Sequence, residues 1–328
     1  MTELALAAFA SERGEHLVAA PRHARFAAFA RTFDERAYRA QLRERGLRWL
    51  ARSDRAFPRL LRAIHDPPAG LFLRGTAPVD LLSQPAVAIV GARACSSYGA
   101  AVARSLGREL AAAGLVVVSG LARGVDGEAH RGALEVGGPT VAVLGCGVDR
   151  DYPASHRELA LRIAERGLVV SEYAPGVEPA PWRFPARNRV VAGLAAATVV
   201  VEARERSGAL ITADLALEEG RDVLAVPGEI TSALSAGTNA LLRLGATPLT
   251  SAADVLEQFG LGGSETGALV DVDGPAAAVL ERLRDGPRGA DDLARATGLG
   301  ADVVAVALSE LELAGHVHAG DGVYRVGA

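Results

Sequence analysis

Arginines and aromatic residues crowd into one short stretch of this sequence. Residues 181–189 hold three arginines, one asparagine and two aromatics. Arginine neutralises phosphates, and aromatic rings stack on unpaired bases for about 1–3 kcal/mol each. The stretch is therefore either a nucleic-acid contact or a proline-rich loop whose aromatics cap a sheet and whose arginines pair with acids. Its candidate binding residues are Arg183, Phe184, Arg187, Asn188 and Arg189.

Glycine-containing segments follow five short apolar runs. A glycine at a strand end permits a tight turn, the amides of the following helix N-terminus bind anions, and an arginine adds a planar fork for phosphate. The carboxyl ends of parallel strands meet at one edge of a sheet, so five such loops favour a phosphate-binding cleft there. Its candidate residues are Gly91, Arg93, Ser96, Ser119, Gly120, Arg123, Gly124, Ser207 and Gly208.

The usual cofactor-binding fingerprints do not occur in these loops. No G-x-G-x-x-G opens the first helix of the alternating region, because Gly145-x-Gly147 comes after the third strand. A Walker A loop needs a lysine, and the chain has none. We therefore expect neither a dehydrogenase nor a bound cofactor.

Several side chains in these loops have the chemistry of nucleophiles, bases or metal ligands. Asp126 and His130 lie four residues apart, where a helix could present them as a ligand pair, although hydrogen bonds between loops are the better interpretation of His130. Cys146 is best read as a small buried thiol. Ser207 lacks the G-x-S-x-G elbow of a hydrolase. Glu202 could be a general base, or could accept hydrogen bonds from loop amides or pair with an arginine. We expect no metal site and no catalytic residue.

An alternation of strands and helices between residues 85 and 260 must position these loops. Apolar strands separated by helices indicate an α/β fold with a doubly wound parallel sheet. The expected strands are Val87–Val90, Leu115–Val118, Thr140–Leu144, Leu168–Val170, Thr198–Val201 and Val223–Val226. The expected helices are Tyr98–Ala113, Asp126–Val136, Ser155–Glu165, Ala209–Glu219 and Asn239–Leu244.

The two ends of the chain differ from this core. Residues 1–65 are predicted to be helical over Thr2–Ala10, Arg22–Thr32 and Phe33–Arg45, and the helical pattern breaks at Asp66-Pro67-Pro68. The C-terminal end follows a glycine-rich linker, for which we take residues 261–270. Residues 271–328 show three helices and a hairpin, which is the winged-helix pattern: Ala276–Arg284, Ala290–Ala296, Asp302–Ala314, His316–His318, a turn at 320–322, and Val323–Val326.

Composition narrows the class of protein. The 328 residues and 33.8 kDa suggest two or three domains, and no apolar run approaches the ~20 residues of a membrane span. Two cysteines, Cys95 and Cys146, are too few for a disulfide scaffold, and we expect a cytoplasmic protein. The net charge is −4, but residues 1–65 carry +6 and residues 66–328 carry −10. A polyanion site in the larger part must therefore be a local cluster.

The order of these motifs resembles the bacterial DNA-processing protein A family (DprA/Smf). The resemblance spans about residues 56–250, and the flanks match that family's N-terminal helical (SAM-like) and C-terminal winged-helix domains in kind. The segments that carry it are Phe57-Pro58, Asp66-Pro67-Pro68, Leu71–Gly75, Val90–Arg93, Tyr98-Gly99, Ser119–Asp126, Ala129-His130, Ala142–Gly147, Asp149, Tyr152-Pro153, Ser171-Glu172, Phe184–Leu194, Val199–Ala203, Ser207–Ala213 and Ala225–Gly228.

The resemblance implies a Rossmann-like core that binds single-stranded DNA, forms a homodimer and has no established catalytic step. It implies a mediator that protects incoming DNA during transformation and loads the RecA recombinase. Arg93 and the loop at Ser119-Gly120 would grip phosphates, with Asp126, His130 and Glu202 in support. Phe184, Arg187, Asn188 and Arg189 would line the base and backbone pocket, and Ser207-Gly208 would close it. Val125, Ala209 and His156 depart from the family pattern and put the fine hydrogen bonding in doubt.

Two other classes of function compete. Related Rossmann-like enzymes hydrolyse nucleoside monophosphates at the N-glycosidic bond with a Pro-Gly-Gly-x-Gly-Thr loop, which residues 202–209 lack. A winged-helix transcription factor would read duplex DNA with its third helix. Residues 270–328 carry a net charge of −5, and Asp302–Ala314 has no basic residue, which disfavours contact with duplex phosphates.

Overall fold

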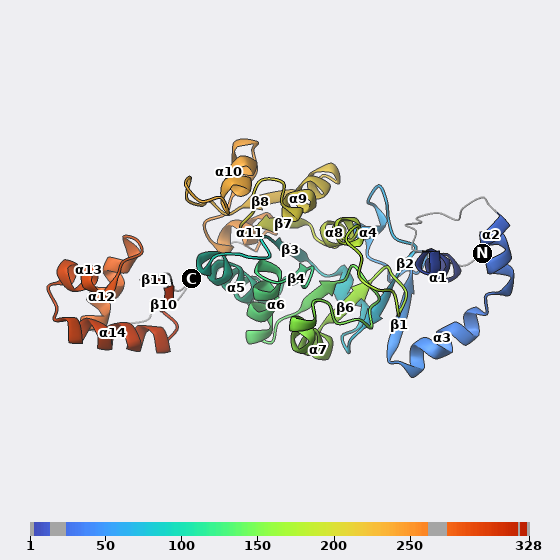
Figure 1. Cartoon of the computed structure of the whole chain (residues 1–328), viewed down its shortest axis with the longest axis horizontal. Helices are drawn as coiled ribbons and strands as arrows, with labels where there is room; N and C mark the ends of the chain where they lie inside the picture. The colour runs from blue at the N-terminus through green and yellow to red at the C-terminus, as the bar shows by residue number, and fades with distance from the viewer. Residues whose placement is uncertain (1–2, 14–23, 262–273, 321, 327–328) are drawn as a thin grey trace.

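The computed structural model describes residues 3–13, 24–261, 274–320 and 322–326. Within these residues, nine strands form one sheet in the order β1-β2-β6-β5-β4-β3-β7-β8-β9 (Figure 1). The strands are β1 (Leu47–Ala51), β2 (Gly70–Arg74), β3 (Ala86–Val90), β4 (Val116–Ser119), β5 (Thr140–Val143), β6 (Leu168–Ser171), β7 (Ala197–Val200), β8 (Asp222–Ala225) and β9 (Thr247–Pro248).

The sheet is parallel from β6 through β9, whereas β2 pairs antiparallel with β6 and β1 antiparallel with β2. The apolar strands are buried on both faces, as a parallel sheet with helices on each side requires. The six strands predicted in the core are all present, within a residue of their expected bounds. The predicted doubly wound α/β fold is confirmed.

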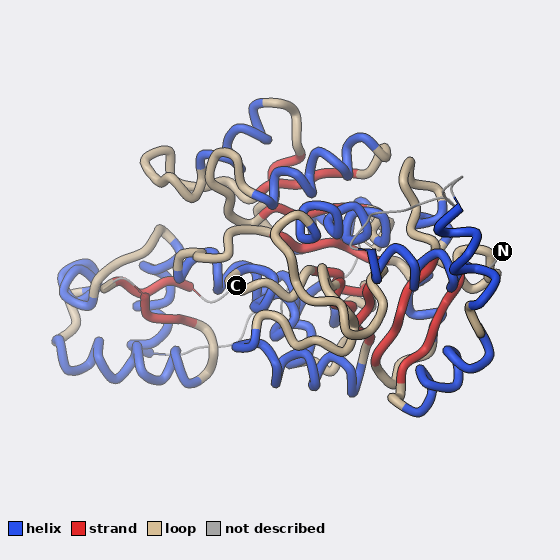
Figure 2. Tube along the Cα trace, turned by 45° about the vertical axis from the view of Figure 1, so that its right-hand side comes forward, coloured by secondary structure: helices blue, strands red, loops and turns tan. Residues whose placement is uncertain are grey.

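Helices cover both faces of the sheet (Figures 1 and 2). One face carries α4, α8, α9 and α10, and the other carries α1, α3, α5, α6, α7 and α11. The helices of the sheet region and the N-terminal end are α1 (Glu3–Arg13), α2 (Ala24–Thr32), α3 (Glu35–Glu44), α4 (Arg59–Arg62), α5 (Ser97–Ala112), α6 (Val125–Glu135), α7 (Arg157–Arg166), α8 (Arg183–Leu194), α9 (Gly208–Glu218), α10 (Ala236–Arg243) and α11 (Ala252–Gln258), with 3-10 turns η1 (Val79–Ser83) and η2 (Ala154–His156).

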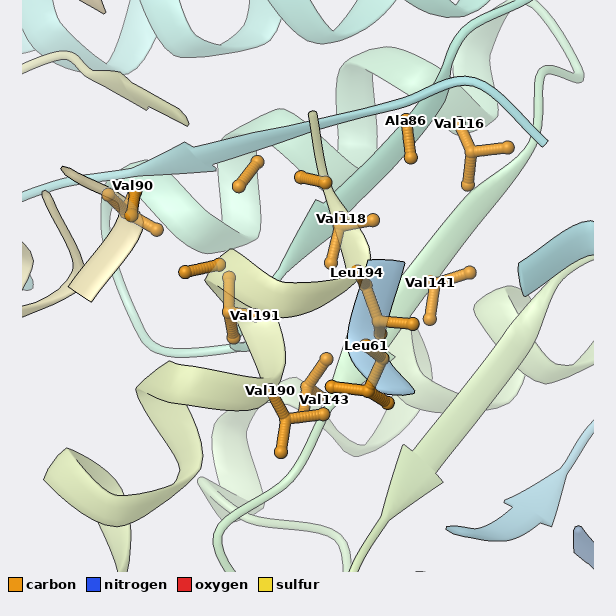
Figure 3. Packing of buried hydrophobic residues seen from close by; sticks show 14 of the residues in the cluster. Leu61, Ala86, Val90, Val116, Val118, Val141, Val143, Val190, Val191 and Leu194 are labelled. Atoms are coloured by element: carbon orange, nitrogen blue, oxygen red, sulfur yellow. The ribbon is translucent and has the colours of Figure 1, made fainter. Parts of the chain in front are cut away.

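The first of these faces forms the core beneath the loops of interest (Figure 3). Alternate strand residues such as Val118 and Val143 point toward α8, whose Val190, Val191 and Leu194 pack on them together with Leu61 of α4. All six side chains are at most 2% exposed, so α8 is fixed to the sheet along one side. The burial of these apolar groups positions the beginning of α8 beside the strand ends.

The C-terminal residues form a smaller unit with its own core. Three helices, α12 (Gly274–Arg284), α13 (Ala290–Thr297) and α14 (Ala301–Leu313), pack with the hairpin of β10 (Val317–Gly320) and β11 (Val323–Val326). This arrangement confirms the predicted winged helix. Most of the expected linker and Asp321 of the expected turn lie outside the described residues. Within the described part of the chain, no helix is both long and apolar enough to span a bilayer.

Two segments differ from expectation. The N-terminal 65 residues are not wholly helical, because Leu47–Ala51 forms β1 and Trp49 packs on Phe72 of β2 with ring centroids 4.6 Å apart. Residues 183–194 form a helix rather than a loop, since Pro185 falls in the first turn, where a missing N–H costs nothing. The division of the chain into domains at residues 65, 260 and 270 stays a prediction.

Candidate functional site

A cleft opens where the connections of the sheet diverge. The chain leaves β3 toward β4 on one side, and leaves the neighbouring β7 toward β8 on the other, so the loops at the carboxyl ends of β3 and β7 separate. A cavity of about 240 Å³, here called lobe one, lies at this point. Its lining comes from four elements: Val90, Gly91, Arg93, Gly120, Ala122, Asp126, Phe184, Pro185, Arg187, Asn188, Val191, Ser207, Gly208, Ala209 and Thr212.

The loop after β3 presents an exposed arginine from an anchored backbone. Gly91 has no room for a side chain, because a Cβ there would lie 2.6 Å from Val125 Cγ2. Ser96 accepts a hydrogen bond from the Gly99 amide and caps α5. The Glu202 carboxylate accepts hydrogen bonds from the Ser96 amide at 2.9 Å and from the Ser96 hydroxyl at 2.5 Å. The Glu202 carboxylate thus holds the backbone and side chain of Ser96, and Ser96 is not among the residues that line lobe one.

The loop after β4 is held by a buried carboxylate. Asp126 accepts hydrogen bonds from the amides of Gly120 at 3.1 Å and Ala122 at 3.3 Å. Ser119 is fully buried and donates to the Ile89 carbonyl at 2.6 Å, which places its hydroxyl outside the cleft. Gly124 adopts φ +73° as the residue before α6, a conformation that favours glycine.

Arg187 of α8 forms the floor between the two loops. Its guanidinium donates to the carbonyls of Gly120, at 2.7 Å, and Val143. Burial raises the pKa of Asp126 and lowers that of Arg187, and the attraction between these two opposite charges opposes both shifts. Gly120 must lack a side chain, because a Cβ would lie 2.4 Å from Arg187 Nη2. Arg187 thus lines the cleft, but its donors at Nη1 are already engaged by the protein.

Phe184 stands beside the exposed arginine of the first loop. The guanidinium carbon of Arg93 lies 5.2 Å from the centroid of the Phe184 ring, within cation–π distance. Asn188 follows one turn later on α8 and donates to the Gly208 carbonyl at 3.1 Å. Ser207 caps α9 by accepting from the Ala209 amide at 3.3 Å. Phe184, Asn188, Ser207 and Gly208 therefore meet in lobe one, together with Gly91, Arg93, Gly120 and Arg187.

Two predicted arginines point elsewhere. Arg189 pairs with Asp66 at 3.1 Å and with Glu172 at 2.6 Å, and lines no part of the cleft. Arg183 packs on the rings of Tyr173 and Trp182 at 5.2 and 4.9 Å. The pairing of Arg189 with two acids fits the structural alternative for this stretch, and the nucleic-acid contact stays a prediction for the residues that line the cleft. A helix turns each residue by about 100°, which places Arg189 about 160° from Arg187 around α8.

The candidate nucleophiles and metal ligands have structural partners. His130 is fully buried, and its Nδ1 lies 2.7 Å from the Thr140 hydroxyl. That hydroxyl donates to the Val117 carbonyl, so His130 donates through Nδ1. Burial lowers the pKa of His130 to about 3 and raises that of Cys146 to about 11. Across the described ranges, no group of three or more histidines, cysteines, aspartates or glutamates is placed to hold a metal ion.

A second cavity of about 270 Å³, here called lobe two, continues from lobe one. The two lobes share Arg93, Gly120, Ala122, Phe184 and Arg187. Lobe two adds Arg123 from the loop after β4, and further residues from the loop after β5 and from η2: Leu144, Gly145, Cys146, Tyr152, Pro153, Ala154 and Ser155. Of these, the sequence singled out only Arg123 as a binding residue. Tyr152 lies nine residues past the end of β5. A search of the residues that directly follow each strand therefore does not find it.

The cleft combines cations, amides and aromatic surface. Arg93 and Arg123 are exposed, and neither forms an ion pair with a carboxylate of the described residues. Unpaired guanidinium groups hold phosphate oxygens, and the rings of Phe184 and Tyr152 offer surface to flat groups. The arrangement can bind a ligand that alternates anionic groups with aromatic rings.

Family models and sequence relatives match most of the chain. The family model described as DNA recombination-mediator protein A matches residues 48–260, and that of the DprA winged helix domain matches residues 264–322. The DNA processing protein DprA of Streptococcus pneumoniae is 48% identical over 210 residues, 63% of this chain and 72% of that protein. The Smf protein of Escherichia coli is 39% identical over 279 residues, 82% of this chain and 74% of that protein.

Solved structures of DNA processing protein A from two bacteria also resemble this chain. DNA processing protein A from Streptococcus pneumoniae matches with a TM-score of 0.64 and 43% identity, over 73% of this chain and 83% of that one. DNA processing protein A from Helicobacter pylori, described for its single-stranded DNA binding mode, matches with a TM-score of 0.59 and 32% identity, over 65% and 95%. With the sequence relatives and the matched models, these structures show that the chain belongs to the DNA-processing protein A (DprA/Smf) family.

Proposed function

We propose that this protein binds single-stranded DNA in the two-lobed cleft, protects it, and helps to load the RecA recombinase during DNA uptake in the cytoplasm. One observation carries the proposal. Two arginines that pair with no carboxylate of the described residues line the cleft: Arg93 lies beside the Phe184 ring and borders both lobes, and Arg123 borders lobe two. The Helicobacter pylori relative supports the choice of ligand, because its structure was described for single-stranded DNA binding.

The geometry favours an unpaired strand over duplex DNA. Cavities of about 240 and 270 Å³ are too small for the stacked base pairs of a duplex, whereas an unpaired strand can present separate bases and phosphates to them. Stacking on aromatic rings also needs bases with open faces. The net charge of −4 gives no general attraction for polyanions, so contact must come from the local arginines.

The proposal describes a binding protein rather than an enzyme. The candidate nucleophiles are engaged in the fold, since the Ser207 hydroxyl caps α9 and the pKa of Cys146 is raised to about 11 by burial. The Glu202 carboxylate accepts hydrogen bonds from the amide and the hydroxyl of Ser96, and Glu202 lines neither lobe. Release of free base from nucleoside monophosphates by the purified protein would instead favour the N-glycosidic hydrolase.

Binding of oligo-dT and of duplex of equal length, measured by fluorescence anisotropy over a salt series, tests the proposal. We expect the single strand to bind at least about tenfold more tightly, equivalent to about 1.4 kcal/mol. Equal or tighter binding of duplex would refute it. Sedimentation of the protein alone tests the homodimer that we propose with it, and stimulation of RecA filament formation on the bound strand tests the loading step.

A further inference from the structure

The two ends of the chain carry helix faces that complement each other in charge. We propose that α14 of one copy of this protein docks on α3 of a second copy, so that copies bound side by side on one DNA strand join head to tail. The inference rests on the proposed function, because the strand brings the copies together. It assigns an interaction surface to each end of the chain, outside the cleft.

The outer face of α14 has an apolar centre and an acidic rim. Val306 and Leu313 are 59% and 91% exposed. At about 100° per residue, Asp302 lies within about 40° of both around the helix axis, and Glu310 and Glu312 flank them on either side. The three acids are exposed, and none forms an ion pair within the described part of the chain. The opposite side of α14 packs in the core of the C-terminal unit, so this face is left for a partner.

The helix α3 presents a basic face of similar length. Arg36 and Arg43 are exposed, lie about 20° apart around the axis, and pair with no carboxylate of the described residues. Ala40 lies between them on the same side of the helix, and its small side chain leaves room for an apolar group of a partner. Glu44 is turned about 100° from Arg43, toward the edge of this face. The face therefore offers two free guanidinium groups on either side of an alanine.

The charges on the two helices have matching spacings. Arg36 and Arg43 are seven residues apart, which is about 10.5 Å along a helix. Asp302 and Glu310 are eight residues apart, which is about 12 Å. In an antiparallel packing, Arg36 meets Glu310. Arg43 then meets Asp302, and Val306 lies against the small side chain between the two arginines.

The placement of the two helices selects a second copy as the occupant. Residues 1–65 carry a net charge of +6 and residues 270–328 carry −5, so the two ends of different copies attract each other. Within one chain, α3 and α14 lie at opposite ends of the molecule with the sheet between them (Figure 1). A contact between two different surfaces of identical chains is heterologous, and it can therefore continue from copy to copy along a strand.

The DNA strand supplies the proximity that this contact needs. Exposed ion pairs stabilise little when they act alone, so copies that are free in solution associate weakly through these faces. Two copies on neighbouring sites of one strand are held at a high effective concentration, which turns the same contact into cooperative binding. We therefore expect cooperativity on an oligo-dT that holds several copies, and none on a short oligo-dT that fills one cleft.

Charge reversal and its repair in the full-length chain test the docking. Arg36→Glu with Arg43→Glu reverses α3, and Asp302→Arg with Glu310→Arg reverses α14. Each double variant should lower the ratio of long-strand to short-strand affinity at least about tenfold and leave the short-strand affinity within about twofold. The four substitutions in one chain should restore the ratio, because each surface then meets the opposite charge again.

Matched controls separate the faces from the net charge. Arg55→Glu with Arg59→Glu changes the charge by the same amount as the α3 variant, at exposed arginines outside α3. Glu281→Arg with Asp291→Arg does the same for α14, at exposed acids of α12 and α13. Both controls should keep the cooperativity of the unaltered protein. Equal losses in a variant and its control would assign the effect to net charge and overturn the docking. Thermal melts check that every variant folds.

Cross-linking tests which surfaces meet. Ala40→Cys in one preparation and Val306→Cys in another, bound together on long oligo-dT, should be joined by a bismaleimide only in the mixture. Links in the Ala40→Cys protein alone, beyond those of the unaltered protein, would show a contact of α3 with itself and overturn the head-to-tail arrangement. An absence of links in the mixture would also contradict it.

The remaining outcomes distinguish this contact from the proposed function. If the α3 variant binds short oligo-dT more weakly than its control, and the α14 reversal does not repair the loss, α3 binds DNA itself and the docking is wrong. Binding of long oligo-dT by the unaltered protein without cooperativity would reject the docking and leave the cleft as proposed. A protein that binds no single-stranded DNA would reject the proposed function and this contact with it.

Discussion

At the scale of single residues, exposure separates binding groups from structural groups of the same type. Arg93 and Arg187 both line the cleft, but Arg93 is exposed whereas Arg187 is 5% exposed and donates to two carbonyls. Residue type and spacing alone could not distinguish them. The hydrogen bonds that a buried guanidinium must satisfy decide which arginine is available to a ligand.

Arg93→Ala should weaken single-strand binding at least about tenfold and leave the fold intact. The side chain is exposed and contributes little to the core, while phosphate contacts dominate affinity for nucleic acids. The slope of log affinity against log salt should fall by about 0.7, the value for one phosphate of a single strand. Arg104→Ala is the control, because Arg104 is an exposed arginine of α5 that pairs with Glu135 outside the cleft. An unchanged slope would exclude Arg93 as a phosphate contact.

The buried His130 makes stability depend on pH. Burial, reinforced by the nearby His156, Arg131 and Arg187, lowers its pKa from 6.5 to about 3. Between these values the unfolded chain binds a proton that the folded chain does not. The free energy of unfolding therefore falls as the pH falls below 6.5, by up to about 1.4 kcal/mol per pH unit from this group. Urea unfolding at several pH values between 7 and 5 measures this dependence. His130→Asn should reduce the change in the free energy of unfolding per pH unit. If His130→Asn leaves that change unaltered, the pH dependence comes from other groups.

At the scale of elements, α8 distributes one dense stretch of sequence over two sides of a helix. Phe184 and Asn188 face the cleft, Val190 and Val191 pack on the sheet, and Arg189 reaches acids on the other side. The strands and the glycine loops were predictable from the sequence, because each follows from local periodicity and turn chemistry. α8 was not predictable, because Pro181 and Pro185 are equally typical of a loop. The packing of residues 183–194 on the sheet decides in favour of the helix.

Arg189→Leu should destabilise the protein by about 3 kcal/mol. Arg189 joins α8 to Asp66 and to Glu172, and its side chain and that of Glu172 are 9% and 11% exposed. Removal of one partner from a buried ion pair costs about 3–5 kcal/mol, and the lower end applies because Asp66 is a third exposed. Urea unfolding measures the change. Arg157→Leu, at an arginine 75% exposed, is the control and should stay within about 0.5 kcal/mol. Equal effects of the two variants would contradict the argument.

At the scale of the whole molecule, the cleft and the winged helix share no lining residue. Every residue that lines the two lobes comes from positions 90–212. The β10–β11 hairpin approaches the start of α5 instead, where a Cβ at Gly320 would lie 2.9 Å from Ser97 Oγ. The sequence predicted the winged helix from its order of elements. It could not predict this contact, which joins residues more than two hundred positions apart.

Deletion of residues 265–328 should leave single-strand binding within about tenfold of that of the full chain. The winged helix lines neither lobe, and its net charge of −5 would repel phosphates. α14 has no basic residue, and Val306 and Leu313 are exposed on it, which fits contact with protein better than contact with DNA. Anisotropy on the truncated chain measures the change. A larger loss would show that the hairpin beside α5 takes part in binding.

The antiparallel strands at one side of the sheet also bear on how the chain is made. β1 and β2 pair locally, with Leu47 opposite Arg74, but β2 must wait for Ser171 of β6. About 100 residues separate Phe72 from that partner, which a ribosome adds in roughly 5–20 s. For that time the segment of β2 has no β6 to pair with, so its apolar residues Leu71 and Phe72, both fully buried in the folded chain, lack part of their cover. The unpaired edge of β2 is then open to mispairing, and the emergence of β6 ends that exposure.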